Sequence, residues 1–186
     1  MRLFRPLWVW LVRFRKRRGY GIHSPFAYAF VRGVVLETWP YYAYERLARL
    51  HPWWVRWFRL SPLRCRRLLF RLANYVEPSS FCLLGSMAIE REYIRAAVPS
   101  AREVSKPPAD FVLISTDCQA EAAAIASQMP ENGMMVIEGI RRDRASTAAW
   151  HTLQNAPHTG ITFDLYTYGI VLFDHHLHKQ HYIINF

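Results

Sequence analysis

Residues 111–137 read FVLISTDCQAEAAAIASQMPENGMMVI and contain the clearest secondary-structure pattern of the chain. Phe111–Ile114 and Met134–Ile137 are short, continuously apolar runs, which are typical of strands buried on both faces of a sheet. The segment between them, Gln119–Met129, is rich in alanine and predicts a helix, and Pro130–Gly133 predicts a turn. A strand, a helix and a second strand in this order predict a parallel β-α-β unit.

The same alternation continues on both sides of this unit. Upstream, Phe81–Leu84 is another apolar run, and Ala88–Ala97 predicts the helix that follows it. Downstream, residues 144–155 predict a helix, after which a strand from Ile161 to Phe173 and a strand from Gln180 to Phe186 form an antiparallel hairpin. The sequence therefore predicts an α/β fold with a mostly parallel sheet whose last strand is antiparallel.

The first part of the chain has a different composition. Residues 1–71 contain 16 Lys and Arg and 2 acidic residues, a net +14, whereas residues 72–186 contain 8 and 12, a net −4. Within the basic part, residues 2–18 carry leucine and aromatic side chains at helical spacing between arginines, which predicts a basic amphipathic helix. We therefore expect a basic helical extension, residues 1–75, followed by the α/β domain, residues 76–186.

The basic helix has two interpretations. Its apolar stripe packs on the domain, or it lies on an anionic membrane surface with Trp8 and Trp10 at the depth of the headgroups. Nucleic acid is not expected as a partner, because no RNA-binding signature accompanies the charge. No apolar run reaches the ~18 residues of a membrane span, and the widely spaced Cys65, Cys82 and Cys118 fit a reducing compartment. The expected location is the cytoplasm, at the inner face of the membrane if the helix is interfacial.

Several motifs occur together in one known family. They are GYGIHSPF at 19–26, YYAYE at 41–45, LLFRLANY at 68–75, DLYTYGIVLF at 164–173 and KQHYIINF at 179–186. In this combination, over nearly its whole length, the chain resembles the class I S-adenosylmethionine-dependent methyltransferases, in particular an uncharacterised methyltransferase-like group of the Bacteroidetes. The resemblance implies a Rossmann-like sheet with the strand order 3-2-1-4-5-7-6, and S-adenosylmethionine as cofactor.

The sequence departs from this family around the expected cofactor site. The family's first strand ends in an acidic, glycine-rich turn, because glycines let the backbone approach the ligand at a helix N-terminus. Here Leu83 stands in place of the acid and only Gly85 remains. The resemblance also implies a second strand ending in an acid that holds the ribose, then a helix and a third strand. Only residues 105–108 follow Val104 before the next matched segment, which is too short for such a crossover. The expected strand order is therefore 1-4-5-7-6.

Four residues at the ends of predicted strands are left to bind the cofactor, and the sequence identifies no catalytic residue. A metal site is not expected, because the family's paired acids after the fifth strand have become Glu138-Gly139, and one carboxylate is a poor divalent-cation site. The histidines at 175, 176, 178 and 181 lie in a turn, where adjacent side chains point apart. The candidate cofactor-binding residues are Gly85, Ser86, Asp117 and Glu138.

Three functions are open on the sequence. The first is a degenerate methyltransferase-like protein with an impaired cofactor site. The second is an active methyltransferase that binds its cofactor atypically, and the third is a scaffold that binds a membrane surface or a protein partner. With strands two and three absent, Phe81–Leu84 would form an uncharged edge strand with unpaired backbone groups. We therefore expect Trp53–Phe58 to cover this edge, or a second copy of the chain to pair with it as a homodimer.

Overall fold

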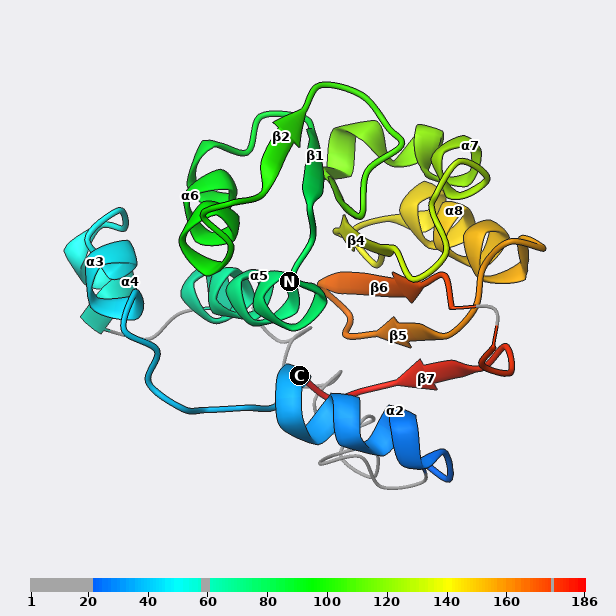
Figure 1. Ribbon diagram of the computed structural model, residues 1–186, viewed down its shortest axis with the longest axis horizontal. Helices are drawn as coiled ribbons and strands as arrows, with labels where there is room; N and C mark the ends of the chain where they lie inside the picture. The colour runs from blue at the N-terminus through cyan, green and yellow to red at the C-terminus, as the bar shows by residue number, and fades with distance from the viewer. Residues whose placement is uncertain (1–21, 58–60, 175) are drawn as a thin grey trace.

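The computed structural model describes residues 22–57, 61–174 and 176–186, and its centre is a seven-stranded sheet (Figure 1). The strands are β1 (Ser80–Leu84), β2 (Arg102–Val104), β3 (Phe111–Ile114), β4 (Met134–Glu138), β5 (Thr162–Asp164), β6 (Tyr168–Leu172) and β7 (His181–Ile183). They lie in the order β2-β1-β3-β4-β6-β5-β7. The first four are parallel, β6 runs antiparallel to β4 and β5, and β7 is parallel to β5.

Helices cover both faces of this sheet. They are α2 (Pro25–Phe30), the π-helix η2 (Val31–Val35), α3 (Tyr44–Ala48), α4 (Trp53–Trp57), α5 (Ser61–Val76), α6 (Ala88–Ala97), the 3-10 helix η3 (Thr116–Glu121), α7 (Ala122–Ala126) and α8 (Arg144–Asn155). The helices α2, η2, α5 and α6 contribute to the hydrophobic cluster on one face, and α7 and α8 to the cluster on the other. The molecule is therefore a three-layer α/β/α structure.

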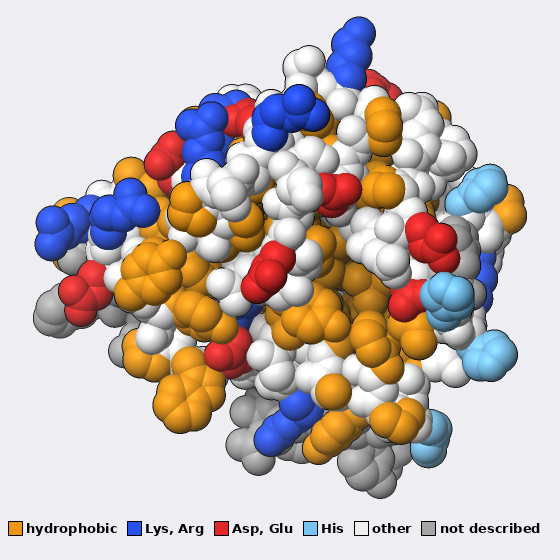
Figure 2. Space-filling view, viewed as in Figure 1, with side chains coloured by type: hydrophobic (Ala, Val, Ile, Leu, Met, Phe, Trp, Pro, Cys, Tyr) orange, Lys and Arg blue, Asp and Glu red, His pale blue; other side chains and the backbone are white. Residues whose placement is uncertain are grey.

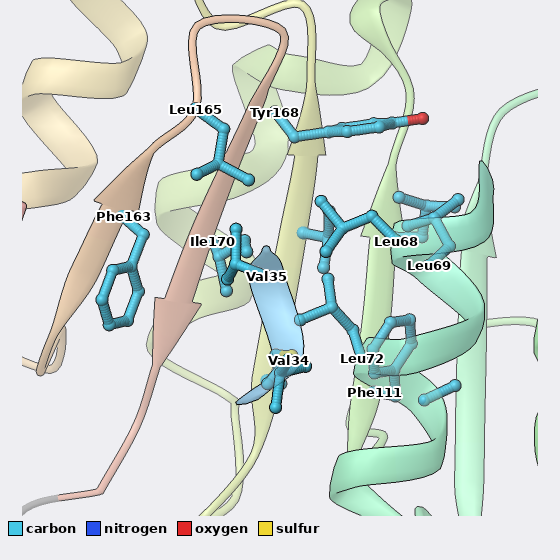
Figure 3. Packing of buried hydrophobic residues seen from close by; sticks show 14 of the residues in the cluster. Val34, Val35, Leu68, Leu69, Leu72, Phe111, Phe163, Leu165, Tyr168 and Ile170 are labelled. Carbon is cyan, nitrogen blue, oxygen red and sulfur yellow. The ribbon is translucent and has the colours of Figure 1, made fainter. Parts of the chain in front are cut away.

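The side chains of the central strands alternate between these two clusters. Phe111 and Leu113 belong to the cluster on the α5 side, whereas Val112 and Ile114 belong to the cluster on the α7 and α8 side. Figure 3 shows leucines of α5 and valines of η2 meeting Phe111 and Ile170 across the first face. Because both faces are covered, these strands must be apolar at every position, which explains the continuous runs in the sequence.

The residues on both sides of the expected boundary at residue 75 contribute to one hydrophobic cluster. Ala27, Phe30 and Leu72 from the first part pack with Phe163 and Ile170 of the sheet. The basic helix expected over residues 2–18 lies outside the described residues. Among the helices of the described part, none has the length and apolarity that crossing a bilayer requires.

The α/β class is confirmed, but one edge of the sheet differs from the expected order. The strand order β2-β1-β3-β4-β6-β5 corresponds to 2-1-4-5-7-6 of the order that the resemblance implies, so strand two is present, and within the described residues strand three has no counterpart. The expectation failed because β2 is three residues long. Residues 105–110 span up to ~20 Å when extended. To begin the next parallel strand, the chain must run back only the length of the three-residue strand β2, ~10 Å. A helix is therefore not needed in this crossover.

The antiparallel strand also lies elsewhere than expected. The segment from Ile161 to Phe173, predicted as one strand, is the hairpin β5–β6, and β6 is the strand that lies between β4 and β5. The last strand, β7, pairs in parallel with β5 at the sheet edge. The turn of the hairpin contains Tyr166 at φ +72°, whose backbone N–H donates to Asp164 Oδ1 at 2.8 Å. This Asx turn replaces the glycine or asparagine that usually marks a tight hairpin.

The predicted edge at Phe81–Leu84 is wrong. Phe81 and Cys82 pair with β2 on one side, and the whole of 81–84 pairs with β3 on the other. Of the expected cover Trp53–Phe58, the described part Trp53–Trp57 contacts α5, and Phe58 lies outside the described residues. Beside β1 lies β2. The reason for expecting a homodimer at residues 81–84 is thereby removed.

Candidate functional site

The candidate site lies where the parallel strands β1, β3 and β4 end. In open α/β sheets, ligands bind in the crevice beyond the carboxyl ends of the strands. Gly85 and Ser86 directly follow β1, Asp117 lies in η3 directly after β3, and Glu138 is the last residue of β4. The structure thus brings the four sequence-predicted residues to one edge of the sheet, as the sequence analysis expected.

Gly85 is fixed by a contact within the protein. Its backbone has φ +113°, a conformation that L side chains rarely adopt. A Cβ built on it would lie 2.1 Å from Ser115 Oγ and 2.6 Å from Ser115 Cβ. The adjacent backbone is tied to the same residue, because Ser115 N–H donates to Leu84 O at 2.9 Å. The space that a glycine leaves open beside its Cα is therefore filled here by the Ser115 side chain.

The Ser115 hydroxyl itself has no hydrogen-bond partner among the described residues. Ser115 is 8% exposed, and its Oγ is buried against Gly85. A buried hydroxyl without a partner costs ~1–3 kcal/mol. Ser115 therefore acts at this position as a space-filling side chain.

A second close contact occurs at the end of β4. Gly139 has φ +73°, and a Cβ there would lie 2.8 Å from Thr116 Oγ1. The Gln119 side-chain amide donates to the backbone carbonyl of Glu138. Ser115, Thr116 and Gln119 therefore contact the residues that end β1 and β4.

The side chains of Ser86 and Asp117 do not converge on this crevice. Ser86 is exposed, and the Asp117 side chain is 87% exposed and lies 3.6 Å from the Arg142 guanidinium. Glu103 is the acid of β2. Its carboxylate accepts hydrogen bonds from Arg91 Nε at 2.9 Å and Arg95 Nη2 at 2.9 Å. The acid nearest to the expected ribose position is thus held in ion pairs with α6.

Glu138 is the one predicted residue with an unusual electrostatic environment. Burial raises the pKa of the Glu138 carboxyl above its ordinary value, and the charge of Glu90 raises it further. A hydrogen bond from the Tyr168 hydroxyl partly offsets this rise in pKa. Figure 3 shows the Tyr168 ring at one end of the cluster with its hydroxyl directed past the aliphatic side chains. A carboxyl that keeps its proton more readily than usual can serve in proton transfer.

A polar network of α5 and α6 lies next to Glu138. Arg66 Nε donates to Glu90 Oε1 at 2.7 Å, and Arg66 Nη1 lies 3.2 Å from His51 Nδ1. His51 Nε2 lies 3.0 Å from the Tyr93 hydroxyl. Because a guanidinium can only donate, His51 Nδ1 accepts and the proton of the neutral imidazole is on Nε2. Burial lowers the pKa of His51, and Arg66 lowers it further, so the ring is neutral at pH 7.

The residues present do not fit S-adenosylmethionine in the arrangement that the resemblance implies. That arrangement needs open space beside the glycine after β1 and a free acid after β2. Ser115 fills the space beside Gly85, and Arg91 engages Glu103. The described residues contain no group of three or more His, Cys, Asp or Glu that could hold a metal ion.

Comparison with known proteins gives a likeness in fold. No protein-family model matches the sequence, and the search of curated proteins found no match. Among solved structures, the chain is similar to the O-methyltransferase TomG of Streptomyces achromogenes in complex with SAM, with 12% identity, 77% of this chain and 95% of that chain covered, and a TM-score of 0.49. A methyltransferase from Geobacter sulfurreducens has 13% identity, coverage of 81% and 98%, and a TM-score of 0.48. The O-methyltransferase of Bacillus cereus in complex with SAH has 10% identity, coverage of 77% and 94%, and a TM-score of 0.39. The chain thus has structural similarity to SAM-dependent O-methyltransferases at low identity, and this likeness concerns the architecture alone.

The sequence analysis missed Ser115 and the network around Arg66. Ser115 comes next to Gly85 only through the β1–β3 register, in which Leu84 pairs with Ile114. No local pattern reports such a contact. Helical spacing offered a signal for Arg66, since Cys65, Leu69 and Leu72 mark the buried side of the same helix and Arg66 borders it.

Proposed function

We propose that this chain is a divergent protein of the methyltransferase fold that does not bind S-adenosylmethionine and does not transfer methyl groups. The observation that supports this proposal is the contact between Ser115 and Gly85, in which Ser115 fills the position that a Cβ of residue 85 would take. The ion pairs of Glu103 with Arg91 and Arg95 support it independently, because they engage the acid of β2.

Isothermal titration calorimetry with S-adenosylmethionine tests the proposal. We expect no binding at micromolar cofactor for the full chain. Two variants are compared with the unchanged chain: Gly85→Val adds a branched side chain at the expected site, and Gly33→Ala changes a glycine of η2 where a Cβ meets nothing within 4 Å. A micromolar Kd that Gly85→Val abolishes and Gly33→Ala preserves would overturn the proposal and favour an active enzyme with an atypical cofactor site.

A second function, attachment to an anionic membrane surface, is favoured by a separate observation. Large aromatic side chains are exposed near α3 and α4: Trp39 is 74% exposed, Tyr42 80% and Trp53 72%. Figure 2 shows hydrophobic side chains together with Lys and Arg at the end of the molecule formed by α3 and α4. Exposed tryptophan and tyrosine beside basic residues are typical of surfaces that insert at the headgroup level.

Co-sedimentation with vesicles of phosphatidylglycerol and phosphatidylcholine tests this second function. We expect binding that weakens when the salt concentration is raised, because surface charges are screened. The double substitution Trp39→Ala and Trp53→Ala should reduce binding, whereas Tyr75→Ala, a half-exposed aromatic on α5, is the matched control. Equal binding by the two variants and the unchanged protein would exclude the aromatic surface as the attachment site.

A further inference from the structure

A cavity of about 260 Å³ lies beside α5. Four parts of the chain form its walls: residues 35–39 at and after the end of η2, Tyr44 of α3, residues of α5 between Leu63 and Arg71, and Phe186. None of the four residues predicted to bind the cofactor lines it. The cavity is therefore separate from the crevice at the strand ends, and the inference drawn from it does not depend on the proposed function.

Three arginines of α5 line this cavity. Arg64, Arg67 and Arg71 are three and four residues apart, so they lie on one face of the helix. All three therefore present their guanidinium groups to the same space. The spacing of these arginines is visible in the sequence. The apolar stripe of the same helix favoured its interpretation as a helix that packs on the domain.

Arg71 is held rigidly at the inner end of the cavity. It is 6% exposed, and its Nε and Nη2 donate to the carbonyls of Val34 at 2.7 Å and Val35 at 2.9 Å. Its Nη1 donates to the Tyr44 hydroxyl over a longer distance, 3.4 Å. These hydrogen bonds orient the guanidinium but do not neutralise its charge.

Arg67 and Arg64 are positioned by aromatic rings. The Arg67 guanidinium lies 4.7 Å from the centre of the Tyr44 ring, and the Arg64 guanidinium lies 4.3 Å from the centre of the Phe186 ring. Among the described residues, the buried Arg67 Nε has no hydrogen-bond partner. Stacking on a ring holds the plane of a guanidinium and leaves its N–H groups available to an acceptor. Two guanidinium groups that line the cavity, those of Arg64 and Arg67, are therefore held in place by rings.

The positive charge of the cavity is not balanced within the described residues. Glu37 has the one acidic side chain among the described lining residues, against three arginines, and it accepts a hydrogen bond from the Tyr41 hydroxyl at 2.8 Å. The ion pairs of the described residues involve other arginines, those at positions 66, 91, 95, 141 and 142. Like charges held close together in a partly buried space repel each other, and an anion relieves that repulsion.

We propose that this arginine pocket binds the phosphate group of an organic phosphate monoester. A phosphate monoester carries about −1.5 to −2 charges at pH 7, which matches several guanidinium groups better than the single charge of a carboxylate does. Guanidinium forks pair with phosphate oxygens through two parallel hydrogen bonds. Trp39, Tyr44 and Phe186 provide apolar walls for the organic part of the ligand. The phosphate belongs either to a soluble ester or to a phospholipid headgroup.

Calorimetric titration of the full chain with phenyl phosphate and with inorganic phosphate tests the pocket. We expect phenyl phosphate to bind more tightly, because its ring contacts the aromatic walls. Arg67→Gln should weaken the binding of phenyl phosphate by about tenfold or more, the effect of losing a charge-assisted hydrogen bond. Arg64→Gln is a second variant of the same kind. Neither substitution removes a hydrogen bond that Arg64 or Arg67 side chains make to the described protein, so both variants should fold, as thermal unfolding can check.

The matched control is Arg102→Gln. Arg102 is an exposed residue of β2 that does not line the cavity, and its substitution removes the same charge as Arg67→Gln does. Its substitution should leave the affinity for phenyl phosphate unchanged. Equal weakening by Arg67→Gln and Arg102→Gln would mean nonspecific attraction of anions and would overturn the proposal.

Vesicles containing phosphatidic acid in phosphatidylcholine distinguish the two sources of phosphate. Binding to these vesicles that phenyl phosphate displaces and Arg67→Gln weakens assigns the pocket to a lipid headgroup. Binding of phenyl phosphate without binding to vesicles assigns it to a soluble ester. Absence of binding to both probes, at concentrations up to the millimolar range, would overturn the proposal.

Discussion

Replacing Gly85 with alanine should lower the free energy of unfolding by about 2–6 kcal/mol, because two effects add. The first is the backbone conformation at φ +113°, which costs an L residue about 1–3 kcal/mol. The second is the overlap of the new Cβ with Ser115 Oγ at 2.1 Å and Ser115 Cβ at 2.6 Å. Relief of such an overlap requires shifts that cost about 1–3 kcal/mol in a packed interior.

The Ser115→Gly substitution separates the two effects. It removes both overlapping atoms, so in this background Gly85→Ala should retain only the cost of the backbone conformation. Urea unfolding of the four proteins of the double-mutant cycle should give a coupling energy of about 1–3 kcal/mol, at equal m-values. Gly33→Ala is the control, because a Cβ at Gly33 meets nothing within 4 Å. A coupling energy indistinguishable from zero would refute the contact and, with it, the main support for the proposed function.

Three further predictions concern the interior. Burial and Arg66 lower the pKa of His51, so below about pH 6.5 the unfolded chain binds the proton and the folded chain does not. Stability should therefore fall with decreasing pH, and unfolding curves of His51→Gln should depend less on pH. Gly169→Ala should destabilise by about 1–3 kcal/mol in urea unfolding, because its Cβ would lie 2.5 Å from the Trp150 ring. Arg71→Met leaves two buried carbonyls at the end of η2 without their donors, and we expect a loss of about 2–4 kcal/mol and a lower Tm.

The sequence predicted those parts of the fold that apolar patterning determines. The runs 111–114, 134–137 and 81–84 are β3 and parts of β4 and β1, because strands covered on both faces must be apolar throughout. The prediction from the sequence failed at β2, because only one of its three residues, Arg102–Val104, is apolar. It also joined β5 and β6, because a turn centred on Tyr166 lacks the glycine or asparagine that marks a hairpin.

The candidate site could be predicted less well. Strand ends are recognisable in the sequence, so Gly85 and Glu138 could be placed at the ends of their strands, where the structure has them. What occupies that edge depends on contacts between residues far apart in the sequence. The contact of Gly85 with Ser115 follows from the pairing of β1 with β3, and the rise in the pKa of Glu138 follows from its burial and from Glu90 on a neighbouring helix. Neither has a local signature.

The short strand β2 also bears on how readily the sheet could recruit a strand from a second molecule. In the described part of the chain β2 forms one border of the sheet, where free backbone groups can recruit a strand from another molecule and begin aggregation. Its three residues offer little length for such recruitment, and two of them, Arg102 and Glu103, are charged. Arg91 and Arg95 add two more charges beside it. A border strand that is short and charged disfavours pairing with a strand of another molecule. Substituting Arg102 and Glu103 together by neutral residues should therefore increase the turbidity of the protein solution on heating.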